Sequence, residues 1–428
     1  MSPKKSNSCA PPKDSTYLTV GQDLFSIQEY VSSQYNASLH QNYLEPMKRF
    51  YPAAFMVYTD LAKLEGLDRP ADYGSGIEFS DGVLDSLFPG QDVGIQIGLW
   101  LAGDEGCGDI NAGRMDGQIE KLIRYVRHCT ATQVFLRVGY EFDNPQFDYI
   151  DPDGYIMAFK RIVSSFRAKL DHREMERIQF VWHSWAAPRL HPLESYYPGH
   201  DFVDWVGVSV FQQVYPWSQE SSSYAGGTLA NVEEVLAFAK NCSKPTMIAE
   251  STPFGGIDMN TNETVAYGLT DAWDRWFMKV MQLIDDWDIS MWSYINCDWD
   301  SQPMWHGIGF GETRISADDT VMRKWRDLVL ARGGGREYLM AGALASCGHK
   351  NEKEKSHFVL GDDVRGNTEQ SISSGMITSR APMWTYASAF LFGGMLVSLI
   401  VIFAKKKNAD IEPSRQGGEN TQLLQQDI

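Results

Sequence analysis

The chain is 428 residues long and 43% of its residues are hydrophobic, which is enough for a sizeable core in one large domain or several small ones. Its formal net charge of −17 argues against nucleic acid or an anionic lipid surface as the main partner. Its six cysteines include no C-x-x-C pair, which excludes a zinc ribbon or a thioredoxin-type site. Disulfides in an oxidising compartment and buried free thiols both remain open.

Short apolar runs alternate with stretches of helical spacing from residue 17 onward. Before them, residues 1–16 are polar and proline-rich and lack the apolar centre of a signal peptide, so we expect a disordered leader or the stump of a chain that starts upstream. Eight strands are predicted, at residues 17–22, 53–60, 92–101, 134–138, 177–185, 204–212, 245–252 and 289–297. Helices are predicted after most of them, at residues 26–35, 114–128, 152–170, 231–241, 270–287 and 317–332.

This alternation predicts an α/β fold, a (β/α)8 TIM barrel over residues 17–332. The alternative is an open doubly wound sheet. It would need a glycine-rich phosphate-binding turn after its first strand, and G-Q-D at residues 21–23 is not such a turn.

The C-terminal part of the sequence has a different composition. Residues 333–382 begin with three glycines and show no sustained period, which predicts a flexible stalk. Residues 383–404 are uncharged and mainly apolar, and as a helix of about 33 Å they are long enough to cross a bilayer. Trp384 and Tyr386 fit one membrane interface and the three lysines that open the polar tail, residues 405–428, fit the other.

We therefore expect a single-pass membrane protein whose barrel is extracellular or luminal, since lysines favour the cytoplasmic side. A tail-anchored protein with a cytosolic barrel is the alternative, because no signal peptide is visible.

Two of the predicted strands carry a glutamate at their carboxyl end. Glu141 follows the fourth strand in the run Q-V-F-L-R-V-G-Y-E-F-D-N-P, and Glu250 ends the seventh in K-P-T-M-I-A-E-S-T. Arg137 shares the strand face of Glu141, and an ion pair that closes a core is one explanation of such a buried charge. Because the carboxyl ends of barrel strands meet at one mouth, we expect the two glutamates to face each other. Hydrolysis of a glycosidic bond needs such a pair of carboxyl groups.

Other chemistries have no support in the sequence. It contains no H-E-x-x-H, no G-x-S-x-G and no Walker motif, and D-W-D at residues 298–300 is too short for a calcium loop. We expect neither a metal nor a cofactor.

The chain resembles the clan of retaining (β/α)8 glycosidases and, within it, glycoside hydrolase family 26, the family of β-mannanases, β-1,3-xylanases and lichenases. The resemblance is carried by G-Q-D at residues 21–23, R-V-G-Y-E at 137–141, F-V-W-H at 180–183, D-W-V-G at 204–207 and I-A-E at 248–250. It implies that Glu141 is the acid/base and Glu250 the nucleophile. The sequence departs from the pattern at Tyr140, where that family usually has histidine. It also departs at Phe211, since the clan often has a tyrosine there that touches the nucleophile, and Tyr215 is the nearest one.

Aromatic side chains near the strand ends predict a sugar-binding cleft, because flat rings stack on sugar rings. Trp292 on the eighth strand is the expected sugar platform. The other predicted substrate contacts are Arg137, Tyr140, Asp143, Trp100, Trp182, His183, Tyr215 and Asp298. Core packing is the alternative for each aromatic residue, and a structural role is the alternative for His183 and Asp298.

The predicted function is a membrane-anchored retaining glycoside hydrolase that cuts a β-linked polysaccharide such as mannan, xylan or mixed-linkage glucan. The alternative is a non-catalytic carbohydrate-binding protein on a decayed barrel, motivated by the departures at Tyr140 and Phe211 and by the stalk. The separation of the two carboxyl groups distinguishes them: retaining hydrolysis needs about 5–5.5 Å and inverting hydrolysis about 6.5–9.5 Å. A much larger gap favours the binding protein.

Overall fold

The computed structural model describes residues 9–40, 51–216, 218, 227–253, 257–258, 263–264, 272–307, 310–330 and 335–347. Within these ranges eight parallel strands close into a barrel, because the first strand pairs with both the second and the last. The strands are β1 (Ser15–Gly21), β2 (Ala54–Asp60), β5 (Gly94–Trp100), β6 (Val134–Val138), β7 (Ile178–Ser184), β8 (Trp205–Val210), β9 (Thr246–Ser251) and β12 (Met291–Ile295). The predicted barrel is confirmed, and all eight predicted strands are present.

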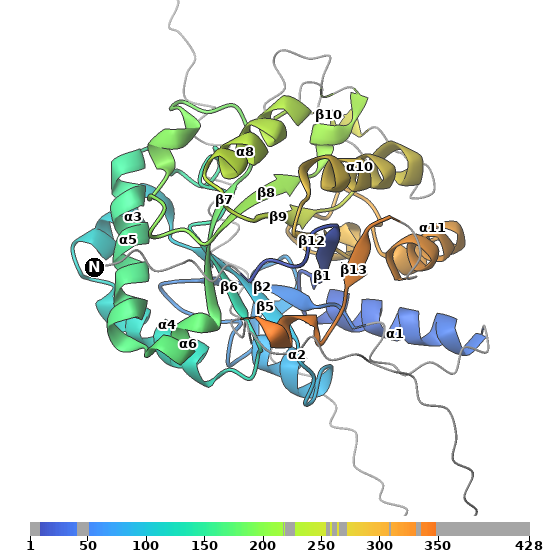
Figure 1. The fold of residues 1–428 in the computed structure, drawn as a ribbon, viewed down its shortest axis with the longest axis horizontal. Helices are drawn as coiled ribbons and strands as arrows, with labels where there is room; N and C mark the ends of the chain where they lie inside the picture. The colour runs from blue at the N-terminus through green and yellow to red at the C-terminus, as the bar shows by residue number, and fades with distance from the viewer. Residues whose placement is uncertain are drawn as a thin grey trace, which may run out of the picture. The chain divides into compact units, whose positions relative to one another are not determined.

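Helices cover the outside of the barrel (Figure 1). They are α1 (Leu24–His40), α2 (Ser80–Ser86), α3 (Gly103–Asn111), α4 (Asp116–His128), α5 (Pro152–Lys169), α6 (His172–Glu176), α8 (Leu229–Asn241), α10 (Met278–Trp287) and α11 (Asp319–Trp325). The π-helical turn η4 (Trp273–Phe277) leads into α10, and η7 (Arg326–Leu330) follows α11. Helix α5 shows how the local sequence sets these bounds. Asp151 caps its first turn by accepting from the Asp153 N–H, and Pro152 occupies the first turn, where no N–H is needed.

The inside of the barrel is apolar at the amino ends of the strands. Side chains alternate between the barrel interior and the helical layer, so each strand contributes every second residue to the inside. The inward side chains at the amino ends form one buried cluster with Leu344: Tyr17, Ala54, Phe135, Val181, Trp205, Met247 and Met291.

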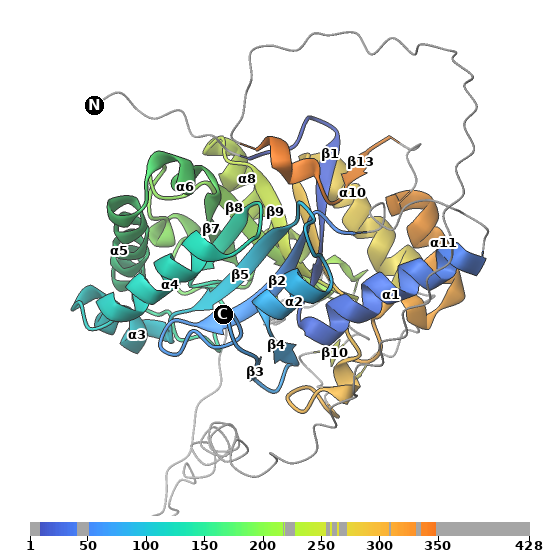
Figure 2. The same ribbon diagram turned by 90° about the horizontal axis from the view of Figure 1, so that it is seen from below.

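A short segment beyond the last helix closes this end of the barrel. Strand β13 (Glu337–Leu339) pairs in parallel with the start of β1, and the two strands lie side by side in Figure 2. The turn η8 (Ala343–Ser346) then places the fully buried Leu344 in the apolar cluster, and Cys347 forms a disulfide with Cys9. The body of the barrel therefore extends past both predicted boundaries, residues 16 and 332. A three-residue strand has too little pattern to be recognised in a glycine-rich, polar stretch.

Two antiparallel hairpins complete the described strands. Strands β3 (Ala71–Asp72) and β4 (Ile77–Glu78) follow β2, and β10 (Ile257–Asp258) and β11 (Glu263–Thr264) follow β9. Among the helices of the described ranges, none has the length and apolar composition needed to span a bilayer. The predicted transmembrane helix at residues 383–404, most of the predicted stalk and the tail lie outside the described residues.

Candidate active site

Glu141 follows β6 in a turn with unusual backbone geometry. Gly139 has φ 57° and Glu141 has φ 52°, both in the left-handed region. Glycine suits the first position, since a Cβ there would lie 2.7 Å from the Tyr155 ring. A glutamate in this region costs about 1–3 kcal/mol and must be held by its surroundings. Ser209 donates to its Oε1 at 2.5 Å and the Asn144 side-chain amide donates to its Oε2 at 3.0 Å.

Glu250 reaches the same space through an irregularity in β9. The pairing of β8 with β9 shifts between Val208, which faces Ile248, and Ser209, which faces Glu250. Ala249 is thus the extra residue of a β-bulge, and bulges of this kind re-aim a side chain next to a site. Glu250 is buried and forms an ion pair with the fully buried Arg137 of β6.

The two glutamates face each other across the barrel mouth, as predicted. One carboxylate oxygen of each, together with a ring nitrogen of His183, all lie within 4.8 Å of one another. This upper limit on the distance between the nearest oxygens fits the short separation of a retaining glycosidase better than the longer one of an inverting enzyme.

The surroundings of the two carboxyl groups differ. Burial raises the pKa of Glu141 well above its ordinary value and the nearby Glu250 raises it further, while the hydrogen bonds from Ser209 and Asn144 lower it. Glu250 has the Arg137 guanidinium as its direct partner. Glu141 is therefore suited to hold a proton, whereas Glu250 lies against a fixed positive charge.

Two tyrosine rings enclose Arg137. Its guanidinium carbon lies 4.9 Å from the centre of the Tyr58 ring and 5.2 Å from that of Tyr140, both within cation–π range. Glu78, from the β3–β4 hairpin, is also fully buried nearby and accepts from the Tyr58 backbone N–H at 3.0 Å. Burial and then the charge of Asp23 raise the pKa of Glu78 well above its ordinary value, so this carboxyl group is suited to be neutral.

Glu141, His183 and Glu250 are spaced closely enough to offer three ligands to a metal ion. The Arg137 guanidinium already contacts both Glu250 and the Nδ1 of His183, so a metal would have to compete with a fixed positive charge. The donor set fits the ion pair better than it fits a metal.

Several predicted substrate contacts are buried. Trp182 and Trp292 point into the layer between the barrel and the helices, and their indole N–H groups donate to the Tyr196 carbonyl and to Ser251 Oγ, each at 3.0 Å. The predicted sugar platform at Trp292 is therefore wrong. Both tryptophans lie between residues that face the barrel interior, and strand alternation sends them outward.

Four polar or aromatic predictions are also corrected. Arg137, His183 and Tyr215 are fully buried, so they do not reach a bound sugar in this conformation. Asp143 accepts from Ser184 Oγ at 2.6 Å, from the Trp185 N–H at 2.5 Å and from Arg189 at 3.2 Å, which occupies its carboxylate. Burial raises the pKa of Asp143, whereas Ser184 and Arg189 lower it. Its place in the structure is that of a loop anchor.

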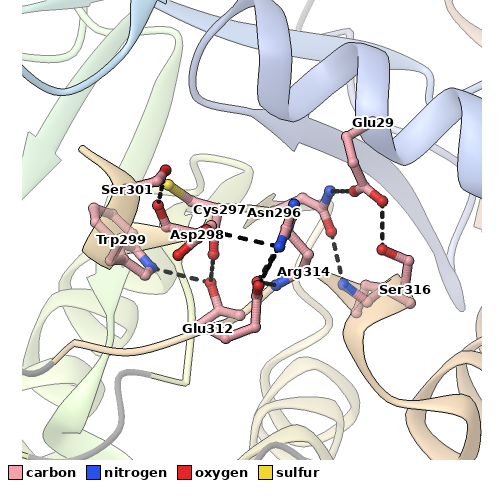
Figure 3. Close-up of polar contacts among 11 residues, drawn as sticks. Glu29, Asn296, Cys297, Asp298, Trp299, Ser301, Glu312, Arg314 and Ser316 are labelled. Carbon is pink, nitrogen blue, oxygen red and sulfur yellow. Dashed lines mark hydrogen bonds and ion pairs between the residues drawn. The ribbon is translucent and has the colours of Figure 1, made fainter.

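Three predicted contacts remain accessible: Trp100, Tyr140 and Asp298. Trp100 ends β5 with 39% of its surface exposed, and Tyr140 is partly exposed beside Glu141. Asp298 lies after β12, where Arg314 approaches its carboxylate at 3.7 Å and binds Glu312 more closely (Figure 3). In that view Asn296 donates to Glu29 of α1 at 2.7 Å, which ties the strand end to the helix.

Asp298 also lines a pocket of about 380 Å³ near the carboxyl ends of β1 and β12. Its other lining residues include Asp23, Asp72, Gln302, Arg314 and the exposed Phe25. The pocket lies at the same end of the barrel as the two glutamates.

Sequence reasoning missed Ser209, Asn144 and Tyr58, which contact the glutamates or Arg137. Ser209 is the one hydroxyl in the apolar strand β8, and such a residue is a signal that a buried polar group needs a partner. Asn144 lies three residues after Glu141 in the same turn, so its side-chain amide can reach the Glu141 carboxylate. Tyr58 carries no signal in the sequence, because an aromatic residue on a barrel strand is ordinary.

No known protein-family model matches this sequence. Two curated relatives are similar to it: the β-1,3-xylanase TXYA of a Vibrio species is 26% identical over 336 residues, and a β-1,3-xylanase of an Alcaligenes species is 26% identical over 340 residues. The matches cover 74% of this chain in both cases, and 65% and 64% of the two relatives, so the chain spans about two thirds of their length. The resemblance to family 26 is therefore confirmed.

Solved structures of family 26 enzymes are also similar to this chain. An endo-β-1,4-mannanase of Cellulomonas fimi has a TM-score of 0.45 and 12% identity, and the match covers 74% of each chain. A GH26C protein of a Muricauda species has a TM-score of 0.42 and 14% identity, with 69% of this chain and 87% of that chain covered.

Proposed function

We propose that the chain is a glycoside hydrolase that cleaves β-1,3-xylan by a retaining double displacement. The observation that carries the proposal is the pair of buried glutamates, whose nearest oxygens lie within 4.8 Å in unlike surroundings. Both curated relatives carry the name β-1,3-xylanase, and this supports β-1,3-xylan over mannan and mixed-linkage glucan as the proposed substrate.

The first chemical step uses both glutamates. Glu141 gives its proton to the glycosidic oxygen while the Glu250 carboxylate attacks the anomeric carbon, so the bond to the leaving sugar breaks and a glycosyl ester forms on Glu250. The raised pKa of Glu141 keeps the proton available for this transfer. Arg137 holds the carboxylate of Glu250 in place before the attack.

The second step reverses the role of Glu141. As a carboxylate it takes a proton from a water molecule, which attacks the same carbon and releases Glu250 with its charge restored. The close approach of the two carboxyl groups supports this route, because inversion needs room for a water molecule between carboxylate and sugar. A non-catalytic binding protein has no use for such a pair, which favours the hydrolase over this alternative.

Reducing-sugar release from β-1,3-xylan, mannan, lichenan and cellulose tests the proposal. The full chain and its Glu250→Ala variant are compared on each polymer. We expect release from β-1,3-xylan that the variant abolishes while its fold, measured by circular dichroism, is retained. An active Glu250→Ala protein ends the mechanism, and sugar binding without hydrolysis by the wild type points to the binding protein.

We also propose that residues 383–404 form a membrane anchor, with a stalk before them, a short polar tail at residues 405–428 and the barrel in an extracellular or luminal compartment. The sequence supports the anchor. The Cys9–Cys347 disulfide supports the compartment, because disulfides persist mainly where the environment is oxidising. Protease treatment of intact cells or sealed vesicles is the test: cleavage of the barrel from outside cells, or protection of it inside vesicles, is expected, and a barrel exposed to the cytosol contradicts the orientation.

A further inference from the structure

A continuous series of hydrogen bonds joins the two glutamates through His183 and Ser209. Arg137 Nη1 contacts both the Glu250 carboxylate and His183 Nδ1, the latter at 3.3 Å. On the other side of its ring, His183 Nε2 lies 3.0 Å from Ser209 Oγ. Ser209 Oγ then lies 2.5 Å from Glu141 Oε1. The series crosses three neighbouring strands, β6, β7 and β8.

The direction of every bond in this series is fixed by chemistry. A guanidinium group has donors and no acceptor, so Arg137 donates and His183 Nδ1 accepts. The single proton of the neutral ring is then on Nε2, which donates to Ser209 Oγ. Ser209 has one proton, and it goes to Glu141 Oε1. Full burial and the charge of Arg137 lower the pKa of His183, in agreement with a neutral ring.

This direction leaves Glu141 with one defined proton-donating oxygen. Because Oε1 accepts from Ser209, the exchangeable proton of the acid form is on Oε2, which otherwise accepts only from Asn144 at 3.0 Å among the residues that the structure describes. After the proton leaves, the Ser209 hydrogen bond stabilises the anion.

We propose that His183 and Ser209 are positioning residues that orient Glu141 for proton transfer and couple it to the Arg137–Glu250 pair. The inference rests on the proposed function. When Glu250 becomes an ester it loses its charge, and Arg137 is left without that anionic partner. The dipoles of His183 and Ser209 point from Arg137 toward Glu141, so the freed positive charge favours the Glu141 anion that forms in the same step.

The other charged and titratable groups around Glu141 do not supply this link. Glu250 on β9 and Arg137 on β6 are the charged groups that face it, and both belong to the series. Tyr140 is adjacent on the chain, and burial raises its pKa well above 10, so its hydroxyl stays neutral. The Asn144 amide contacts Oε2 and does not connect to the pair.

The test compares Ser209→Ala with the wild type on two substrates across pH. On β-1,3-xylan we expect kcat/KM at the optimum to fall about tenfold or more, because the general acid is no longer held in place. The alkaline limb of the pH profile, where kcat/KM falls as Glu141 loses its proton, should move up by about one pH unit. The reason is that the lost hydrogen bond favoured the Glu141 anion. On a 2,4-dinitrophenyl β-xylobioside, whose leaving group departs without acid help, kcat/KM should stay within about twofold of the wild-type value.

Ser293→Ala is the matched control. Ser293 is a fully buried serine on β12 that donates to Gln96 Oε1 at 3.0 Å and takes no part in the series, so its variant should keep both the rate and the pH profile. His183→Gln, whose amide can still donate to Ser209, should keep the alkaline limb, whereas His183→Leu should move it as Ser209→Ala does. Melting temperatures confirm that each variant is folded.

The outcomes separate the two proposals. An active wild type with an unshifted alkaline limb in Ser209→Ala, or with equal losses on the two substrates, overturns the positioning role and leaves the proposed function intact. A wild type that is inactive on both substrates overturns the proposed function, and the positioning role with it.

Discussion

The two ends of the barrel are built on opposite principles. At the amino end the inward side chains are apolar, Leu344 fills the centre, and the Cys9–Cys347 disulfide fastens the closing segment. At the carboxyl end the same strands carry Arg137, Glu141 and Glu250, all nearly or fully buried. Burying charge is costly even when it is paired, whereas burying apolar surface is the main source of stability.

The described part of the carboxyl end also holds unusual backbone geometry and unpartnered polar atoms at the site itself. Glu141 has a left-handed backbone, and a bulge interrupts β9 at Ala249. Among the described residues, Glu78 Oε1 and Arg137 Nε have no hydrogen-bond partner. The difference teaches that this barrel is stabilised at one end so that the other can hold an energetically unfavourable arrangement of charges.

The largest expected effect is on catalysis at the carboxyl end. Glu141→Gln removes the general acid, so kcat/KM on β-1,3-xylan should fall by about 10²–10⁴-fold. Because burial raises the pKa of Glu141, the acid form persists above the usual range of a glutamate, and wild-type activity falls as pH rises through that raised pKa. The variant has no such group and should lose the alkaline limb. If the alkaline limb is unchanged in the variant, it reports the ionisation of another residue.

The cost of the buried ion pair can be measured directly. Glu250→Leu leaves Arg137 buried without its carboxylate, which should lower the free energy of unfolding by about 3–5 kcal/mol. Adding Arg137→Met removes the stranded charge and should recover most of that loss, although activity stays absent. Urea unfolding of the wild type and both variants gives the values. If the double variant is no more stable than the single one, the Arg137–Glu250 ion pair stabilises the fold. The proposed difference between a stabilising amino end and a costly carboxyl end is then wrong.

Substitutions at the apolar amino end should lower the stability of the protein and leave catalysis unchanged. Leu344→Ala opens a cavity in the closed cluster and should cost about 2–5 kcal/mol of unfolding free energy, with kcat unchanged below the melting temperature. Leu190→Ala is the control, since 83% of Leu190 is exposed and its truncation should cost nothing measurable. A fall in kcat with Leu344→Ala shows that the two ends are not independent.

The disulfide adds to the same end. It closes a loop with a sequence separation of 338, so Cys347→Ser should lower the free energy of unfolding by about 2–4 kcal/mol and leave kcat unchanged. Cys242→Ser, at a free and partly exposed cysteine, provides the comparison under identical oxidising conditions. Equal stability of the two variants indicates that the closing segment holds without its covalent link.

The smallest expected effect is at the rim of the carboxyl end. Trp100→Ala removes an exposed ring from the end of β5 and should raise KM for β-1,3-xylan by about three- to tenfold, with kcat unchanged. Met157→Ala on α5, which is similarly exposed on the helical layer, should leave KM as it is. An unchanged KM in Trp100→Ala removes this ring from the binding surface.

The strands and the two glutamates could be predicted because both follow from a local pattern, an apolar run that ends in a carboxylate. The orientation of Trp182 and Trp292 could not be predicted. Alternation shows that every second side chain points the same way, but not which of the two sets faces the barrel interior. The bulge at Ala249, which sets the aim of Glu250, has no signature in I-A-E. The disulfide could not be predicted either, because the spacing of six cysteines does not determine how they pair.

Proton NMR of the first sugar released from β-1,3-xylan tests the central claim most directly. The nearest oxygens of the two carboxyl groups lie within 4.8 Å, which favours direct attack by Glu250 over attack by a water molecule, so the reaction should pass through a glycosyl ester on Glu250. The β-anomer should therefore appear first and mutarotate later to the equilibrium mixture. Initial appearance of the α-anomer means direct attack by water, and it contradicts the assignment of Glu250 as the nucleophile.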